Sequence, residues 1–239
     1  GGSLKYDYFS PNEKNRLSIF ASAANTDRDS YYGPGNDPLK AYGKTTDLIA
    51  MGGAQYVHTF DKCLFMPSDL TAGLEYNRDR LKDNMWGYDR HTDQTVNIYS
   101  AFLQNEWKNE RWSILVGGRL DKHNMVDNII FSPRANLRFN PTQNINLRLS
   151  YSSGFRAPQA FDEDMHIENV GGTVAMIERA KNLKEEKSQS FSASADIYHR
   201  FGAFQTNFLI EGFYTKLTDV FVLGEPYNRG DGVLVKLRS

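Results

Sequence analysis

Apolar and polar residues alternate along almost the whole chain, and this period of two limits the fold more than any other feature of the sequence. Between residues 144 and 152, every odd position is apolar and every even position is Asn, Arg or Ser. Similar alternation recurs at residues 16–23, 70–77, 112–121 and 190–197. Consecutive side chains of a strand point to opposite faces, so these segments predict strands with one apolar and one polar face. The sequence therefore predicts an all-β protein of antiparallel strands.

The connections between these strands alternate in length. Short turns are expected at residues 61–68, 108–110, 140–143 and around 202, and longer polar connections at 25–46, 80–92, 122–128 and 154–185. In an up-and-down meander, this places every short turn at one end of the sheet and every long loop at the other. Only residues 174–184 would tolerate a helix.

Aromatic residues gather near both ends of the expected strands. One group flanks the short turns: Phe60, Trp107, Trp112, Phe139, Tyr198, Phe201 and Phe204. A second group lies near the opposite ends: Tyr76, Tyr151 and Tyr214. Two aromatic bands, separated by about nine or ten strand residues, are typical of the girdles of a transmembrane β-barrel.

The positions of the charged residues indicate which face would meet lipid. Charges in mid-strand fall on the polar faces: Glu75, Arg134, Arg138, Arg148, Asp196 and Glu211. The apolar faces nearly lack them, and an Arg or Lys facing lipid at the bilayer midplane would cost about 2–4 kcal/mol. This favours a barrel with lipid outside and water inside. A soluble β-sandwich, which also alternates, is the alternative.

Composition excludes several other classes of protein. The 239 residues carry 28 basic and 29 acidic side chains, which gives no global field for nucleic-acid binding. No apolar run approaches the 18 residues of a transmembrane helix, and the first residues do not form a signal peptide. The single cysteine, Cys63, cannot form an internal disulfide. The pattern predicts ten or eleven strands from residues 4–9 to 233–237; the last is too short to span a bilayer, so we expect a piece of a larger barrel.

Several motifs in the second half resemble those of TonB-dependent outer-membrane receptors. Residues 132–141 (SPRANLRFNP) resemble the SPR-x-x-L-x-Y-x-P hairpin of that family, and residues 154–158 (GFRAP) resemble the start of a long extracellular loop. Residues 182–188 (NLKEEKS) are similar to its NLKPEKS motif, with Glu185 where proline is usual. Residues 211–219 resemble its FY-x-x-x-x-D strand end. Together the motifs span 131–221 in family order, whereas the first half matches in pattern only.

The resemblance implies a 22-stranded barrel in the outer membrane of a Gram-negative bacterium, of which residues 1–239 would be a part without the plug domain. It implies uptake of a scarce nutrient, driven by TonB through an N-terminal region, with outer-membrane lipid as surroundings and no cofactor. A metal chelate (ferric siderophore, haem or cobalamin) is the expected cargo. The alternatives are a SusC-like glycan importer and a soluble or surface carbohydrate-binding β protein.

Candidate ligand-binding residues lie in the expected long loops. They are Tyr31, Tyr32, Trp86, Tyr88, Arg90, His91, Phe155, Arg156 and His166. Aromatic and cationic side chains suit a conjugated anionic chelate or a sugar ring. A weaker expectation is a Ca²⁺ site at Asp27, Asp29 and Asp37, because Ca²⁺ prefers oxygen ligands.

Catalytic motifs are absent from the sequence. It has no G-x-S-x-G, H-E-x-x-H, Walker or G-x-G-x-x-G pattern. Asp121 and His123 could imitate part of an outer-membrane hydrolase site, but no serine in a strained turn accompanies them. The sequence therefore predicts a receptor and not an enzyme.

Overall fold

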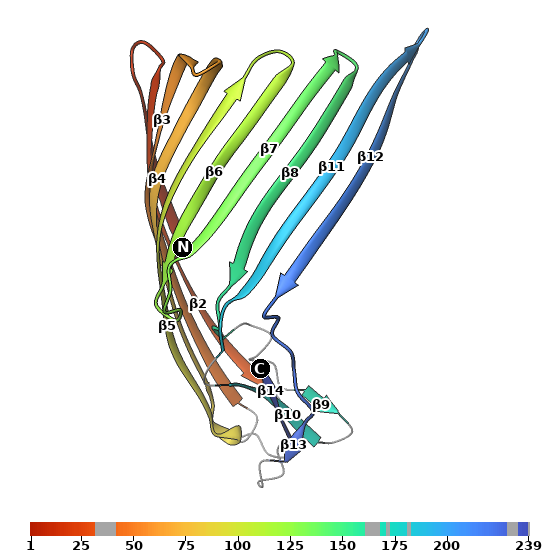
Figure 1. Ribbon diagram of the computed structural model, residues 1–239. Helices are drawn as coiled ribbons and strands as arrows, with labels where there is room; N and C mark the ends of the chain where they lie inside the picture. The colour runs from red at the N-terminus through yellow and green to blue at the C-terminus, as the bar shows by residue number, and fades with distance from the viewer. Residues whose placement is uncertain (32–41, 161–167, 171–172, 181–182, 229–233, 239) are drawn as a thin grey trace.

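The computed structural model describes residues 1–31, 42–160, 168–170, 173–180, 183–228 and 234–238 (Figure 1). The first strands are β1 (Gly2–Phe9), β2 (Asn15–Tyr31), β3 (Tyr42–Cys63), β4 (Met66–Met85), β5 (Arg90–Lys108), β6 (Trp112–His123) and β7 (Ile130–Thr142). The later ones are β8 (Ile145–Arg156), β9 (Glu168–Val170), β10 (Thr173–Arg179), β11 (Glu186–Phe201), β12 (Phe204–Thr218), β13 (Tyr227–Asn228) and β14 (Leu234–Arg238). A 3-10 turn, η1 (Trp86–Tyr88), joins β4 to β5. Among the described residues, no helix is long and apolar enough to cross a membrane.

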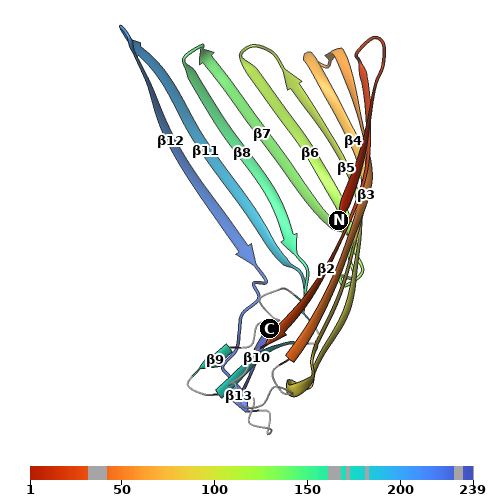
Figure 2. The same ribbon diagram turned by 180° about the vertical axis from the view of Figure 1, so that it is seen from behind.

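Ten strands form one antiparallel meander in the order β1-β2-β3-β4-β5-β6-β7-β8-β11-β12. Each strand pairs with its neighbours in this order, so the predicted up-and-down meander is confirmed. Figures 1 and 2 show that the sheet is strongly curved and open, with β1 and β12 at its two edges. The short turns all lie at one end of the sheet, and the longer connections lie at the other.

Cross-strand pairing separates an apolar face from a polar face. Residues that pair directly point to the same side, and one such row is Tyr6, Ile19, Ala54, Leu74, Ala101, Leu120 and Phe131. The neighbouring row on the opposite side is Asp7, Ser18, Gln55, Gly73, Phe102, Arg119 and Ser132. The alternation read from the sequence is therefore realised in the register.

Glycines on the polar face leave room for aromatic rings of the next strand. A Cβ added at Gly73 would lie 2.3 Å from Cζ of Phe102, and one added at Gly53 would lie 2.8 Å from Cζ of Phe20. Both rings therefore lie flat over the backbone of the adjacent strand. Side chains at these positions would force the rings away from the sheet.

Two rows of aromatic side chains border the central part of the apolar face. Near the short turns, Trp112 and Phe139 stack with their ring centroids 4.1 Å apart. Near the other end, the centroids of Tyr76 and Tyr99 are 4.9 Å apart and those of Tyr151 and Phe191 are 4.8 Å apart. We call the second group, together with Tyr214, the upper aromatic row, where upper means the end away from the short turns, which is drawn at the bottom of Figure 1. The two bands expected from the sequence are confirmed except at Tyr198, which lies on the polar face and donates its hydroxyl proton to Asp196.

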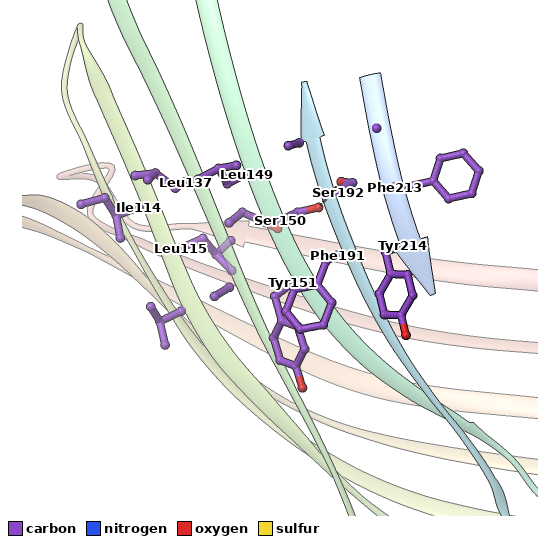
Figure 3. A pocket seen from close by; sticks show the side chains of 15 residues that line it. Ile114, Leu115, Leu137, Leu149, Ser150, Tyr151, Phe191, Ser192, Phe213 and Tyr214 are labelled. Carbon is purple, nitrogen blue, oxygen red and sulfur yellow. Dashed lines mark hydrogen bonds between the residues drawn. The ribbon is translucent and has the colours of Figure 1, made fainter. Parts of the chain in front are cut away.

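The apolar face is uncovered. Val116 and Leu149 are 51% and 55% exposed, although they lie in mid-strand. A shallow hollow of about 800 Å³ lies on this face across β6, β7, β8, β11 and β12. Figure 3 shows Tyr151, Phe191 and Tyr214 beside it, whereas Phe213 points to the opposite side of β12. No second layer of described residues packs here, as a sandwich would require.

Three central strands are longer than the sequence pattern indicated. β3 has 22 residues, β4 has 20 and β5 has 19. The expected loop at 80–92 is therefore wrong: β4 and β5 continue through it and meet at η1. The loop expected at 25–46 is also shorter, because β2 and β3 remain paired up to Tyr31 and Tyr42. These extensions carry polar residues on both faces, so they lack the alternation of apolar and polar residues from which the strands were predicted.

A small second sheet departs from the simple meander. It has the order β13-β14-β10-β9, and its β10–β14 pair is parallel. The segment expected to tolerate a helix thus contains β10. The last expected strand is β14, which pairs with β10 and β13 rather than with the ten-stranded sheet. Both views place this sheet at the end opposite the short turns (Figures 1 and 2).

Candidate luminal binding site

Strands β7 and β8 separate near their upper ends and leave a polar hollow. Their pairing stops at Arg134 and Ser152, although β7 remains paired with β6 as far as Ile130. Two adjoining hollows, of about 420 and 340 Å³, lie at this separation. Both are lined by Glu75, Arg119, Ser132 and Ser153. We call this region the luminal hollow.

A charged network forms one wall of the luminal hollow. Arg119 donates to Glu75 over 2.6 Å and to Asp121 over 2.8 Å. Ser100 donates its hydroxyl proton to the same oxygen of Asp121 over 2.6 Å. Because Arg119 is shared between two carboxylates, the network carries a net negative charge and holds its side chains in fixed positions.

The chain leaving β8 folds back over β5 and β6. The backbone N–H of Ala160 donates to Oε1 of Gln94 over 2.8 Å. Nδ1 of His123 accepts from the N–H of Met125, so Nε2 carries the proton that faces Oε1 of Gln159 at 3.3 Å. Burial lowers the pKa of His123, which lies beyond the upper aromatic row, and this favours the neutral ring.

A small apolar cluster holds the same segment. Val126, Ile130 and Ala157 are buried against one another, and Phe155 packs on them. Residues 155–160 are thus attached to the wall by both apolar and polar contacts. We call them the inward segment.

The extensions of β3, β4 and β5 are held by a buried ion pair. Asp83, whose side chain is 2% exposed, accepts from Nη2 of Arg90 over 2.8 Å and from Nε over 3.1 Å. The hydroxyl of Thr45 donates to its other oxygen over 2.7 Å. Three strands are therefore linked through one carboxylate at a level where backbone pairing alone would leave their ends free to fray.

Two carboxyl groups face each other below this ion pair. Asp79 lies on β4, three residues beyond Tyr76, and pairs with Ile49 of β3; Asp47 lies on the same face of β3, two residues from Ile49. Burial, together with the hydrogen bond to Asp47, raises the pKa of Asp79 to about 6. The pair can therefore hold a proton in mildly acidic conditions.

Three of the sequence candidates lie near the tips of the long strands, but they do not converge. Trp86 is 56% exposed at η1. Tyr31 packs edge-on against Tyr42 at 5.2 Å, on the same side of the sheet as the apolar face. His91 shares that side and contacts Asn84 over 2.9 Å. The backbone of Tyr88 lies in η1.

The remaining candidates fall into three groups. Phe155 lines the luminal hollow, and the guanidinium of Arg156 lies 5.9 Å from the ring centroid of Phe221. Arg90 has a structural partner in Asp83. The calls at Tyr32, Asp37 and His166 lie outside the described residues.

The expected Ca²⁺ ligands remain a prediction. Asp27 and Asp29 lie on β2, and Asp27 accepts hydrogen bonds from Asn25 and Thr46. Within the described ranges, no group of three or more His, Cys, Asp or Glu side chains could hold a metal ion.

Sequence reasoning did not select Glu75, Arg119 and Asp121 as one site. Each lies at a polar position of its strand, and register places them side by side across β4, β5 and β6. Mid-strand charge was the available signal, but it does not specify which strands pair. Ser100 donates to Asp121 and not to His123, so these residues do not form a nucleophilic triad.

Solved structures share this fold at low sequence identity. A siderophore receptor, PirA, from Acinetobacter baumannii matches with a TM-score of 0.70 and 16% identity, over 99% of this chain and 39% of that one. A mutant of the ferric enterobactin receptor PfeA of Pseudomonas aeruginosa, solved in complex with enterobactin, matches with a TM-score of 0.74 and 16% identity, over 99% of this chain and 38% of that one. The iron transporter FrpB of Neisseria meningitidis gives 0.63 and 16% over 98% and 37%. The chain thus spans about two fifths of these proteins.

Family membership follows from the sequence comparison. No curated protein sequence matches the chain. The family model described as "TonB dependent receptor-like, beta-barrel" matches residues 2–233. With the ten-stranded meander and the uncharged band between two aromatic rows, this match shows that the chain belongs to the TonB-dependent receptor-like β-barrel family.

Proposed function

We propose that this chain is part of the barrel domain of a receptor in the outer membrane of a Gram-negative bacterium, which imports a metal chelate with energy from TonB. A ferric siderophore is the substrate class best supported. Residues 1–239 would contribute part of the barrel wall and of the extracellular rim. The receptor family and the siderophore, enterobactin and iron proteins among its structural neighbours support this choice.

The observation that carries the proposal is the contrast between the two faces of the sheet. The apolar face carries no charged side chain between its aromatic rows among the described residues, so it suits hydrocarbon. The polar face carries Glu75 and Arg119 at the same depth, which requires water or polar groups. A wall with these two faces suits one side of a polar passage through a bilayer.

The described residues suggest where a cargo would first make contact. Trp86 is exposed at the end of the β4–β5 extension, beyond the membrane-spanning part. An exposed indole can stack on a flat conjugated ligand such as a catecholate or a porphyrin. Arg90, held by Asp83, keeps the extension in place. We therefore assign contact with cargo to Trp86 and a positioning role to Arg90.

Equilibrium titration of the full-length receptor in detergent tests this proposal. The ligands are a ferric catecholate, a ferric hydroxamate, haem, cobalamin and a maltooligosaccharide. We expect one metal chelate to bind, and Trp86→Ala to weaken that binding by about tenfold, as loss of one stacking aromatic does. The matched control is Phe65→Ala, which removes an exposed ring from a short turn at the other end.

The outcomes separate the alternatives. Binding of the oligosaccharide alone would replace the proposal with a glycan importer. A full-length protein that remains monomeric and soluble without detergent would support the carbohydrate-binding β protein. Equal effects of the two variants would remove Trp86 from the binding site while leaving the substrate class to the titration itself.

A further inference from the structure

The apolar face changes character immediately above the upper aromatic row. On β4, the residues of this face after Tyr76 are Arg78, Arg80 and Lys82, at every second position. All three are exposed. They point away from Asp79 and Asp83, which lie on the polar face of the same strand. The outward side of β4 thus passes directly from aromatic to basic.

The first two rows above Tyr76 are basic without acidic compensation. Arg78 pairs with Ala50 and Asn97, and Arg80 pairs with Leu48 and Thr95. Acidic residues first appear one row higher, at Lys82. Nζ of Lys82 lies 3.5 Å from Oδ2 of Asp93 on β5. On the other side, Lys82 pairs with Thr46 of β3, which in turn pairs with Asp27 of β2. Among the described residues, neither the guanidinium group of Arg78 nor that of Arg80 forms a side-chain hydrogen bond or ion pair. We call Arg78 and Arg80 the outer arginine pair.

Basic side chains also lie in or just above the upper aromatic row on other strands. Lys122 pairs with Tyr99 of the upper aromatic row, and its ammonium group donates to the carbonyls of Val126 and Asp127. On β12, Lys216 follows Tyr214 on the same side and is exposed. The outer arginine pair is therefore the part of this basic band in which two cationic side chains occupy successive outward positions of one strand.

The depth of this pair matches the headgroup layer. Two residues advance by about 6.5–7 Å along a strand, and barrel strands tilt by about 35–45°, so Arg78 lies about 5 Å and Arg80 about 10 Å above Tyr76 along the membrane normal. Interfacial aromatics mark the edge of the hydrocarbon, and the polar layer beyond it is about 5–8 Å thick on each side. Both guanidinium groups can therefore reach phosphates of a lipid.

The ligand is unlike the transported cargo, because the site faces away from the passage. Guanidinium groups bind phosphate through two parallel hydrogen bonds, and two of them on one strand face suit a lipid with more than one phosphate. We propose that the outer arginine pair binds the phosphate groups of a phosphorylated glycolipid in the outer leaflet. This inference rests on the membrane placement in the proposed function but not on the cargo.

Native mass spectrometry of the full-length receptor in detergent tests the inference. The probes are diphosphorylated lipid A, the same lipid without phosphate, and inorganic pyrophosphate. We expect the double variant Arg78→Gln/Arg80→Gln to bind the phosphorylated lipid at least tenfold more weakly than the wild type. The double variant Arg78→Lys/Arg80→Lys, which keeps the charge but not the paired donors, should lose less.

The matched control is Lys44→Gln/Lys82→Gln, which removes two positive charges from the same side of β3 and β4 one or two rows higher. Its lipid binding should stay within about twofold of the wild type. Each variant is first required to keep heat-modifiable migration in gels, which reports a folded barrel.

Three results would overturn the inference. These are unchanged lipid binding in Arg78→Gln/Arg80→Gln, equal losses in that variant and in the control, and pyrophosphate binding as tight as that of the phosphorylated lipid. Failure of chelate uptake would not affect this readout, since no cargo is present. A receptor that is soluble without detergent would instead refute the membrane placement shared by both proposals.

Discussion

The two halves of the ten-stranded sheet are alike within the membrane-spanning part and different above it. β3, β4 and β5 have 22, 20 and 19 residues and remain paired far beyond the upper aromatic row. β6, β7 and β8 have 12, 13 and 12 residues and end near it. In the first half, the upper wall is a continued strand ladder. In the second half, a folded-back segment takes its place.

The two halves of the rim are held in place by different kinds of contact. The extended half is fixed by backbone pairing and by the ion pair of Asp83 with Arg90. The shorter half depends on the inward segment, which is held by a small apolar cluster and a few hydrogen bonds. Few contacts mean a low cost of local opening, so we expect the second half to be the adaptable side of the rim.

Removing the carboxylate of the buried ion pair should have the largest effect. Asp83→Ala removes the carboxylate that neutralises the buried guanidinium of Arg90, and breaking one side of a buried ion pair costs about 3–5 kcal/mol. Hydrogen exchange of the full-length receptor in detergent should show faster exchange in the upper parts of β3, β4 and β5. The control is Lys82→Ala, whose exposed ion pair should contribute about 0–1 kcal/mol. Equal loss of protection in β6–β8 would show that the two halves are not independent.

A charge on the apolar face should have the next largest effect. Leu103 lies midway between Trp107 and Tyr99 on β5 and is 57% exposed. Leu103→Arg should destabilise the folded receptor in a bilayer by about 2–4 kcal/mol, because the charge would lie near the midplane. Asn136→Arg, on the polar face of β7, should change stability by about 0.5 kcal/mol or less. Urea unfolding in vesicles measures both, and similar costs would contradict the assignment of faces.

The carboxyl pair makes the extended half sensitive to pH. The folded-state pKa of Asp79 is about 6, above the usual 3.8, so the folded state binds more protons between these values. Its contribution to stability is full below about pH 4 and is lost as pH rises through about 6. Asp79→Asn should therefore stabilise the receptor at pH 8 by about 1–2 kcal/mol, a range reduced for solvent screening, and should not do so at pH 4. The same gain at both pH values would contradict repulsion within the pair.

The membrane-spanning part was readable from the sequence, since burial on one side forces a strict period of two. Residues 144–152 show this most clearly. The extensions of β3, β4 and β5 could not be predicted in this way, because they have no apolar face above the upper aromatic row. On β4, for example, Arg80 and Lys82 point outward while Asp79 and Asp83 point inward. Polar residues on both sides resemble a loop. The network of Glu75, Arg119 and Asp121 was hidden for another reason, namely that it depends on register between three strands.

The smallest effect should come from the inward segment, and it tests whether that segment is truly held by the other half. Gln94→Ala removes the acceptor for the N–H of Ala160 and should cost about 1 kcal/mol. The amide of Ala160 should then exchange about fivefold faster, while amides of β4 above Tyr76 keep their rates. Gln55→Ala, on the polar face of β3, is the control. Unchanged exchange at Ala160 would mean that the apolar cluster alone positions the segment, and that the adaptable rim does not depend on the extended wall.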